Sequence, residues 1–174
     1  LGRHQEYSGK KIQYFDNETN KSYVPYVVET SIGLDRMFLH VISAAFNEEE
    51  LTREDGTTDS RVVMKLPPFL APVKLAVFPL TKKDGLPDRA RAIINELRFD
   101  FNCQYEEKDS IGRRYRRQDA IGTPYCITVD HQTLKDDTVT IRYRDSMEQE
   151  RVRIDAVKQI IKDKVDISNL LKQL

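Results

Sequence analysis

The chain of 174 residues has little of what metal and redox centres are built from, with two cysteines and three histidines. Cys103 and Cys126 lie in or beside apolar segments, so we expect reduced, buried thiols without the spacing of a metal site. A nucleophile pair of Cys103 and His131 is the less favoured alternative, because cysteines in apolar strands usually belong to a core. P-loop and GxGxxG motifs are also missing. The residues predict no catalytic group and no metal site.

Net charge and long apolar runs are missing too. The 28 Lys and Arg residues balance 28 Asp and Glu residues, so contact with a nucleic acid requires an uneven distribution of charge. No apolar run approaches the length of a membrane span, and the first residues have no signal-peptide pattern. We therefore expect a cytoplasmic protein without a membrane partner. Because the sequence does not begin with methionine, we expect it to be part of a longer protein.

The first part of the chain combines aromatic and β-branched residues with one helical pattern. The polar stretch 16–20 predicts a turn between two short strands, and residues 23–29 predict a further strand. Apolar residues then recur at helical spacing from Leu34 and predict a helix that ends near Phe46. The charged stretch 47–60 predicts a disordered acidic connection.

Prolines divide the chain near its middle. Pro67, Pro68 and Pro72 mark a boundary where a helix cannot continue, so we expect a domain to begin near Leu66. The predicted organisation has three parts, which are residues 1–47, a charged connection over 48–65, and a domain over 66–174.

From Val73 onward, the pattern alternates between strands and helices. The nearly continuous apolar run 73–80 is typical of a strand covered on both faces. Helices are expected after Gly85 and after Ser110, with strands near 101–105 and 124–129. Such alternation predicts an α/β fold, a mixed sheet with helices on both faces and right-handed crossovers.

A later strand is predicted over residues 138–144 from its clean alternation. Val139 and Ile141 are expected to face the core, while Arg142 and Arg144 point to the other side. One face of this strand is therefore expected to be core and the other basic.

Four arginines crowd into positions 113–117, in the helix expected between Ser110 and the stop at Gly122. The first turn of a helix exposes unpaired N–H groups and a positive dipole end, so cations there favour the arrival of an anion, most often phosphate. Interleaved tyrosines suit the stacking of unpaired bases in single-stranded RNA. The alternative is a solvated face neutralised by the neighbouring acids Glu106, Glu107, Asp109 and Asp119.

A second candidate site combines Glu29, Ser31, Gly33 and Arg36. A carboxylate, a hydroxyl, an open backbone and a guanidinium suit a pocket for an amine on one side and phosphate on the other. The alternative, which the residues alone favour, is a helix cap by Ser31 with Arg36 paired to Asp35 or to a glutamate.

Two sets of motifs resemble a known family. Residues 24–36, VPYVVETSIGLDR, resemble motif 3 of a class II aminoacyl-tRNA synthetase, in the form found in dimeric glycyl-tRNA synthetases of the eukaryote-like type. Residues 76–80 (AVFPL), 110–119 (SIGRRYRRQD) and 121–124 (IGTP) resemble the C-terminal anticodon-binding domain shared by glycyl, histidyl, prolyl and threonyl enzymes. Residues 142–149 (RYRDSMEQ) are similar to the glycyl branch. The resemblance implies the C-terminal part of such an enzyme: a remnant of the antiparallel catalytic sheet with its helix, then an α/β anticodon-binding domain.

The resemblance also implies roles for the second candidate site. Glu29 and Ser31 would hold the amino group of glycine, Arg36 would lie over the ATP adenine and reach toward the terminal phosphate, and Gly33 would keep the turn close to ATP. The intact enzyme would be a homodimer that uses ATP with Mg²⁺ to join glycine to tRNA(Gly), without a DNA partner. Motifs 1 and 2 are not in this sequence, so we expect the chain alone to be inactive and to need no cofactor.

For the tRNA anticodon, the resemblance and the charge pattern together predict seven contact residues. Backbone phosphates are assigned to Arg113, Arg114, Arg116 and Arg117, and base edges to Arg142, Arg144 and Glu148. The alternative is a non-catalytic module of the same fold, acting as an accessory or dimerisation subunit. The nearly intact amine pocket argues against that alternative.

Overall fold

The computed structural model describes residues 1–52, 56 and 58–172. The chain divides into two compact units, Leu1–Met37 and Phe38–Leu174, and we describe each by itself. Helix α2 (Leu34–Ala45) begins in the first unit and ends in the second, close to the predicted end near Phe46. No helix among the described residues is long and apolar enough to cross a membrane.

The first unit holds α1 (Gly2–Ser8) and a hairpin of β1 (Tyr14–Asp16) and β2 (Lys21–Tyr23). The predicted turn at 16–20 is confirmed, because Tyr14 pairs with Tyr23 across the hairpin. The strand predicted over 23–29 is wrong beyond Tyr23, since residues 24–33 form neither helix nor strand. None of the strands in the described part of the chain pairs with them. A segment rich in strand-forming residues needs a partner strand for its backbone N–H and C=O groups.

In the second unit, α2 is followed by an antiparallel hairpin of β3 (Phe46–Thr52) and β4 (Thr58–Met64). The expectation of a disordered connection over 47–60 is therefore wrong for the described residues, and 53–55 and 57 lie outside them. Residues of this stretch form an ordered strand because one face of β4 is buried. Arg61 and Val63, two residues apart, are 1% and 0% exposed, so the alternation of the strand is fixed by tertiary contact.

A five-stranded mixed sheet forms the centre of the second unit, in the order β6-β5-β7-β8-β9. Strands β6 and β7 both run parallel to β5. Strand β8 is antiparallel to β7, and β9 is antiparallel to β8. The strands are β5 (Leu75–Pro79), β6 (Cys103–Tyr105), β7 (Tyr125–Val129), β8 (Thr138–Tyr143) and β9 (Gln149–Arg153). The helices are α3 (Leu86–Leu97), α4 (Ile111–Ile121), α5 (Thr133–Asp136), α6 (Ile154–Val165) and α7 (Ile167–Leu171).

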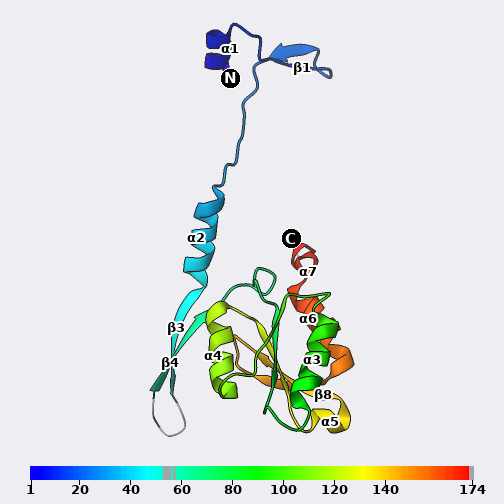
Figure 1. Ribbon diagram of the computed structural model, residues 1–174. Helices are drawn as coiled ribbons and strands as arrows, with labels where there is room; N and C mark the ends of the chain where they lie inside the picture. Colours follow the sequence, from blue (N-terminus) through cyan, green and yellow to red (C-terminus); the bar gives the residue numbers. More distant parts are fainter. Residues whose placement is uncertain (53–55, 57, 173–174) are drawn as a thin grey trace. The chain divides into compact units, whose positions relative to one another are not determined.

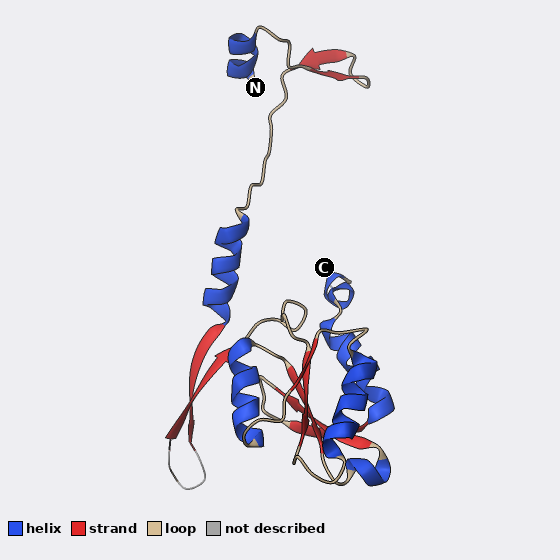
Figure 2. Cartoon of the chain, viewed as in Figure 1, coloured by secondary structure: helices blue, strands red, loops and turns tan. Residues whose placement is uncertain are grey.

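Helices cover both faces of this sheet, as predicted (Figure 2). On one face, Ile93 of α3 and Ile161 of α6 join a core with Val77 and Ile127. On the other, α4 packs against Phe78, and the β3–β4 hairpin lies beside α4 (Figure 1). The helix with the arginine run thus lies between the sheet and the hairpin.

Candidate nucleic-acid interface

Helix α4 begins after Ser110 and ends at Gly122, as predicted. Ser110 occupies the N-cap position, but its side chain makes no cap hydrogen bond in the described structure. Gly122 has φ 85°, the left-handed conformation that favours glycine. An added Cβ would lie 3.0 Å from the carbonyl oxygen of Met64, so β4 approaches the helix end closely.

Arg114 is buried and serves as an internal link. Its Nη1 donates to the carbonyl of Pro79 at 2.5 Å, at the end of β5, and its Nη2 donates to the carbonyl of Asp109 at 2.8 Å. With 3% of its surface exposed, Arg114 is not available to an external phosphate. It ties the start of α4 to the end of β5.

Arg116 and Arg117 are partly exposed and ion-paired. Nη2 of Arg116 lies 2.8 Å from Oδ2 of Asp59, and Nη1 of Arg117 lies 2.9 Å from Oδ2 of Asp109. Hydrogen bonding to Glu106 raises the pKa of Arg117, so the neutralisation considered from the sequence is present here. Within the described part of the chain, Nη1 of Arg116 and Nε of Arg117 are buried and have no hydrogen-bond partner.

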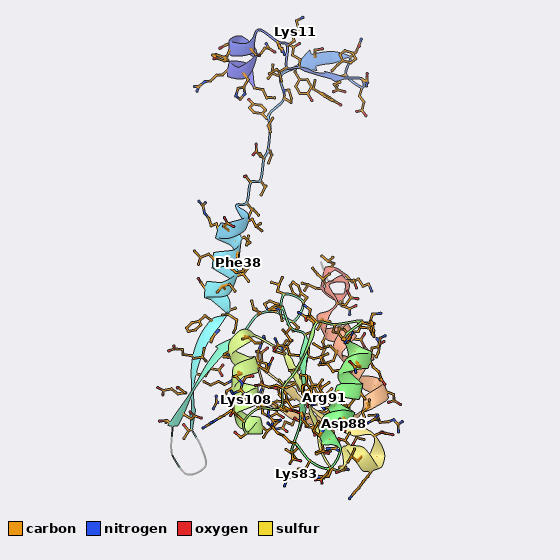
Figure 3. The ribbon with its side chains drawn as sticks, in the orientation of Figure 1. Lys11, Phe38, Lys83, Asp88, Arg91 and Lys108 are labelled. Carbon is orange, nitrogen blue, oxygen red and sulfur yellow. The ribbon has the colours of Figure 1, made fainter. Side chains whose placement is uncertain are left out.

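Arg113 differs from the other arginines of the run. It lies in the first turn of α4, is exposed, and makes no hydrogen bond or ion pair with any described residue. The dipole of α4 is positive there and no described acid neutralises its guanidinium, so an anion is favoured at this point. Lys108, in the loop before α4, lies near this end of the helix (Figure 3).

The basic face predicted for β8 is wrong, because Arg142 is 6% exposed. Its Nη1 and Nη2 donate to Oδ1 and Oδ2 of Asp119 at 2.9 and 3.0 Å, and its guanidinium lies 4.7 Å from the centre of the Tyr115 ring. Burial is the largest single influence and lowers the pKa of Arg142, but hydrogen bonding and charge attraction, chiefly with Asp119, together outweigh it and the pKa is raised. Helix α4 covers this side of β8 and supplies the carboxylate.

Arg144 is also buried, with 2% of its surface exposed. It donates to the carboxylate of Asp145 and to the carbonyls of Gly122 and Leu66 at 2.9 and 2.8 Å. These bonds hold the β8–β9 turn against the loop between α4 and β7. Arg144 therefore links neighbouring segments of the protein and presents almost none of its surface to solvent.

Glu148 is exposed in the β8–β9 turn, where it lines a hollow of about 460 Å³ with Tyr125, Tyr143 and Lys164. Because β8 is antiparallel to β7, this turn lies at the end of the sheet where β7 begins. Helix α4 follows β6, which is parallel to β5 and β7, and so starts at the opposite end, where β7 finishes. The structure thus separates Glu148 from Arg113 instead of bringing them together.

Arg61 is a residue of this network that sequence reasoning missed. Its Nε donates to Oδ2 of Asp119 at 3.0 Å, its Nη1 to Oε2 of Glu49 at 2.9 Å, and its Nη2 to the carbonyl of Arg144. It lies in the stretch expected to be disordered. The only local signal is the pair Val62 and Val63, which favours a strand.

The second candidate site lies in an exposed segment. Glu29, Ser31, Gly33 and Arg36 are all exposed, and their side chains make no mutual hydrogen bond in the described structure. Gly33, not Ser31, precedes α2 and its carbonyl accepts from N–H of Met37 at 2.9 Å. The helix cap by Ser31 is therefore not formed, nor does Arg36 pair with a described acid. The donor set suits an amine and phosphates, but the described segment does not assemble it into a pocket.

Metal binding has no support in the described ranges, which contain no group of three or more His, Cys, Asp or Glu residues arranged to hold an ion. Burial raises the pKa of Cys103 to about 11 and raises that of Cys126 further, so both thiols stay protonated near neutral pH.

Comparisons with known proteins give a consistent picture. The family described as "Anticodon binding domain" matches residues 74–164. The chain is 51% identical over 166 residues to the glycine–tRNA ligase of Clostridium perfringens, covering 95% of this chain and 35% of that protein. It is 48% identical over 170 residues to the glycine–tRNA ligase of Treponema denticola, covering 97% and 37%. It thus spans little more than a third of these relatives.

Among solved structures, the RNA binding domain of threonyl-tRNA synthetase from Cryptosporidium parvum Iowa II has a similar fold. The TM-score is 0.53 at 22% sequence identity, with 57% of this chain and 25% of that chain covered. At this identity the likeness concerns the fold alone. It agrees with the mixed α/β architecture that the sequence predicts.

Proposed function

Because this chain belongs to the anticodon-binding domain family, we propose that it is part of a larger glycine–tRNA ligase and holds the anticodon of tRNA(Gly). The observation that carries the proposal is its identity of about half to bacterial glycine–tRNA ligases over nearly its whole length. The unpaired guanidinium of Arg113 supplies a starting point for RNA.

The intact protein, on this proposal, is a cytoplasmic homodimer. It is of the eukaryote-like glycyl-tRNA synthetase type, because residues 24–36 resemble motif 3 of that type. The carboxylate of glycine attacks the α-phosphate of ATP, which is bound with Mg²⁺, and pyrophosphate leaves. The terminal ribose of tRNA(Gly) then takes the glycyl group and AMP leaves. Glu29 and Ser31 hold the ammonium group, while Arg36 and the open backbone of Gly33 serve ATP. Glycyl-adenylate formation by the 174-residue chain alone would contradict its expected inactivity.

The proposed RNA surface is narrower than the seven residues expected from the sequence. Arg113 contacts a phosphate directly, and Arg116 and Arg117, which are partly exposed but ion-paired, lie along the same helix. The buried residues among the seven, Arg114, Arg142 and Arg144, hold this helix and its neighbours from within. Glu148 remains a proposed base contact. Its carboxylate is exposed at the end of the sheet opposite to the start of α4.

Binding of a tRNA(Gly) transcript over a series of salt concentrations tests this surface. Arg113→Ala should weaken binding and flatten the slope of log K against log salt by about one unit or less, since one phosphate contact is lost. Arg98→Ala is the matched control, because Arg98 follows α3 on the other face and is also exposed. Its slope should equal that of the wild type. Equal affinity for transcripts with altered anticodon bases would contradict anticodon recognition.

A further inference from the structure

Strand β4 runs along the arginine helix and contacts it with alternate residues. Oδ2 of Asp59 lies 2.8 Å from Nη2 of Arg116, and Nε of Arg61 lies 3.0 Å from Oδ2 of Asp119. Positions two apart share one face of a strand, and positions three apart share one side of a helix. The contacts are therefore a continuous interface between β4 and α4.

The contact at Arg61 fixes α4 from two sides. Asp119 has no exposed surface and accepts hydrogen bonds from Arg61 of β4 and from Arg142 of β8. A buried carboxylate held by two guanidinium groups resists displacement, because separating any of these charges leaves one buried without a partner. Arg61 lies outside residues 74–164, which match the anticodon-binding family, yet it completes the interior of that domain.

The contact at Asp59 has a different consequence. Its carboxylate takes one terminal nitrogen of Arg116, whose side chain remains 36% exposed. A negative charge beside an arginine of the proposed RNA surface weakens the general attraction to RNA. Its benefit is geometric, since a guanidinium held at Nη2, with Nη1 buried, keeps the exposed remainder of the Arg116 side chain in a defined direction.

We propose that β4 belongs to the RNA-binding unit and that Asp59 and Arg61 are positioning residues for helix α4. Asp59 orients Arg116, and Arg61 holds the helix through Asp119. The inference rests on the function proposed above. The RNA-binding unit then extends upstream of the family match and includes the β3–β4 hairpin.

Asp59→Asn in the 174-residue chain distinguishes a positioning role of Asp59 from a purely electrostatic one. The two roles predict opposite changes in the affinity for tRNA. Loss of a negative charge near the RNA surface would by itself tighten binding of a tRNA(Gly) transcript. Loss of the orienting contact should instead weaken binding, by up to about fivefold, the range that a partly exposed ion pair contributes. The pair is about one-third exposed on both sides, so the urea midpoint should barely change.

Glu50→Gln is the matched control on the same hairpin. Glu50 is exposed and pairs with Ser60, so it lies on the face of the hairpin opposite to Asp59 and Arg61. This variant removes the same charge and should bind as tightly as the wild type or slightly tighter. If Asp59→Asn behaves like Glu50→Gln while the wild type binds tRNA, the inference is wrong and the proposed function stands. A wild type that does not bind tRNA contradicts the proposed function itself.

Arg61→Lys provides the second measurement. Lysine keeps the charge but cannot reproduce the fork that reaches Asp119, Glu49 and the carbonyl of Arg144 together. We expect weaker tRNA binding under conditions in which unfolding assays show a folded protein. Lys65→Gln, which breaks only the ion pair of Lys65 with Glu49, should bind normally. Equal binding by Arg61→Lys and Lys65→Gln would overturn the role of Arg61, and if Arg61→Lys does not fold, Asp59→Asn decides the proposal.

Discussion

Arg142 of β8 donates both terminal nitrogens to the carboxylate of Asp119 on α4, at 2.9 and 3.0 Å. The side chains are 7% and 0% exposed. Removal of one partner from a buried pair leaves the other charge without compensation. We expect Asp119→Asn to lower the free energy of unfolding in urea by about 3–5 kcal/mol.

A matched control for this prediction is Asp155→Asn. Asp155 pairs with Arg153 at 3.0 Å, but both side chains are about two-thirds exposed, so solvent screens the pair. Its urea midpoint should stay close to that of the wild type. Similar losses in the two variants would contradict the structural role of the buried pair.

Gly122 is expected to be intolerant of a side chain. Its φ of 85° is strained for alanine, and an added Cβ would approach the carbonyl of Met64 to 3.0 Å. Gly122→Ala should lower the free energy of unfolding by about 1–2 kcal/mol from the backbone conformation alone. In Gly112→Ala the new Cβ meets no atom within 4 Å, and helix propensity favours alanine by up to about 1 kcal/mol. A Gly122 variant as stable as Gly112→Ala would contradict the contact with β4.

Asp130 gives a pH-dependent prediction. A hydrogen bond from Arg151, aided by Thr133, lowers the pKa of Asp130 from 3.8 to about 2. Because the folded-state pKa is depressed, the stabilisation is complete above the unfolded-state value and is lost as the pH falls toward 2. We expect Asp130→Asn to cost about 2 kcal/mol near neutral pH. This difference from the wild type should shrink between about pH 4 and pH 2 in urea titrations. A difference that stays constant down to pH 2 would rule out this ionic contribution.

Local pattern was sufficient for the α/β part of the fold. The apolar run that became β5, the helical stripe of α3 and the glycine stop of α4 each depend on period or on backbone conformation. The strand expected over 23–29 failed because β-propensity needs a partner strand. The hairpin at β3 and β4 was missed because its charged residues are typical of solvated segments.

By itself, the sequence determined the order of strands and helices from Val73 to the strand at 138–144, apart from the short helix α5, and the motifs that resemble the family. Only the tertiary structure decided which arginines face solvent. Arg113 and Arg114 are neighbours in the chain, yet one is exposed and the other is buried against the end of β5. Charge and spacing in the sequence do not distinguish these two arginines. Burial depends on hydrogen-bond acceptors that distant segments supply. The sequence therefore places an arginine helix in the fold, and packing separates its solvent-facing arginine from those that hold the helix in place.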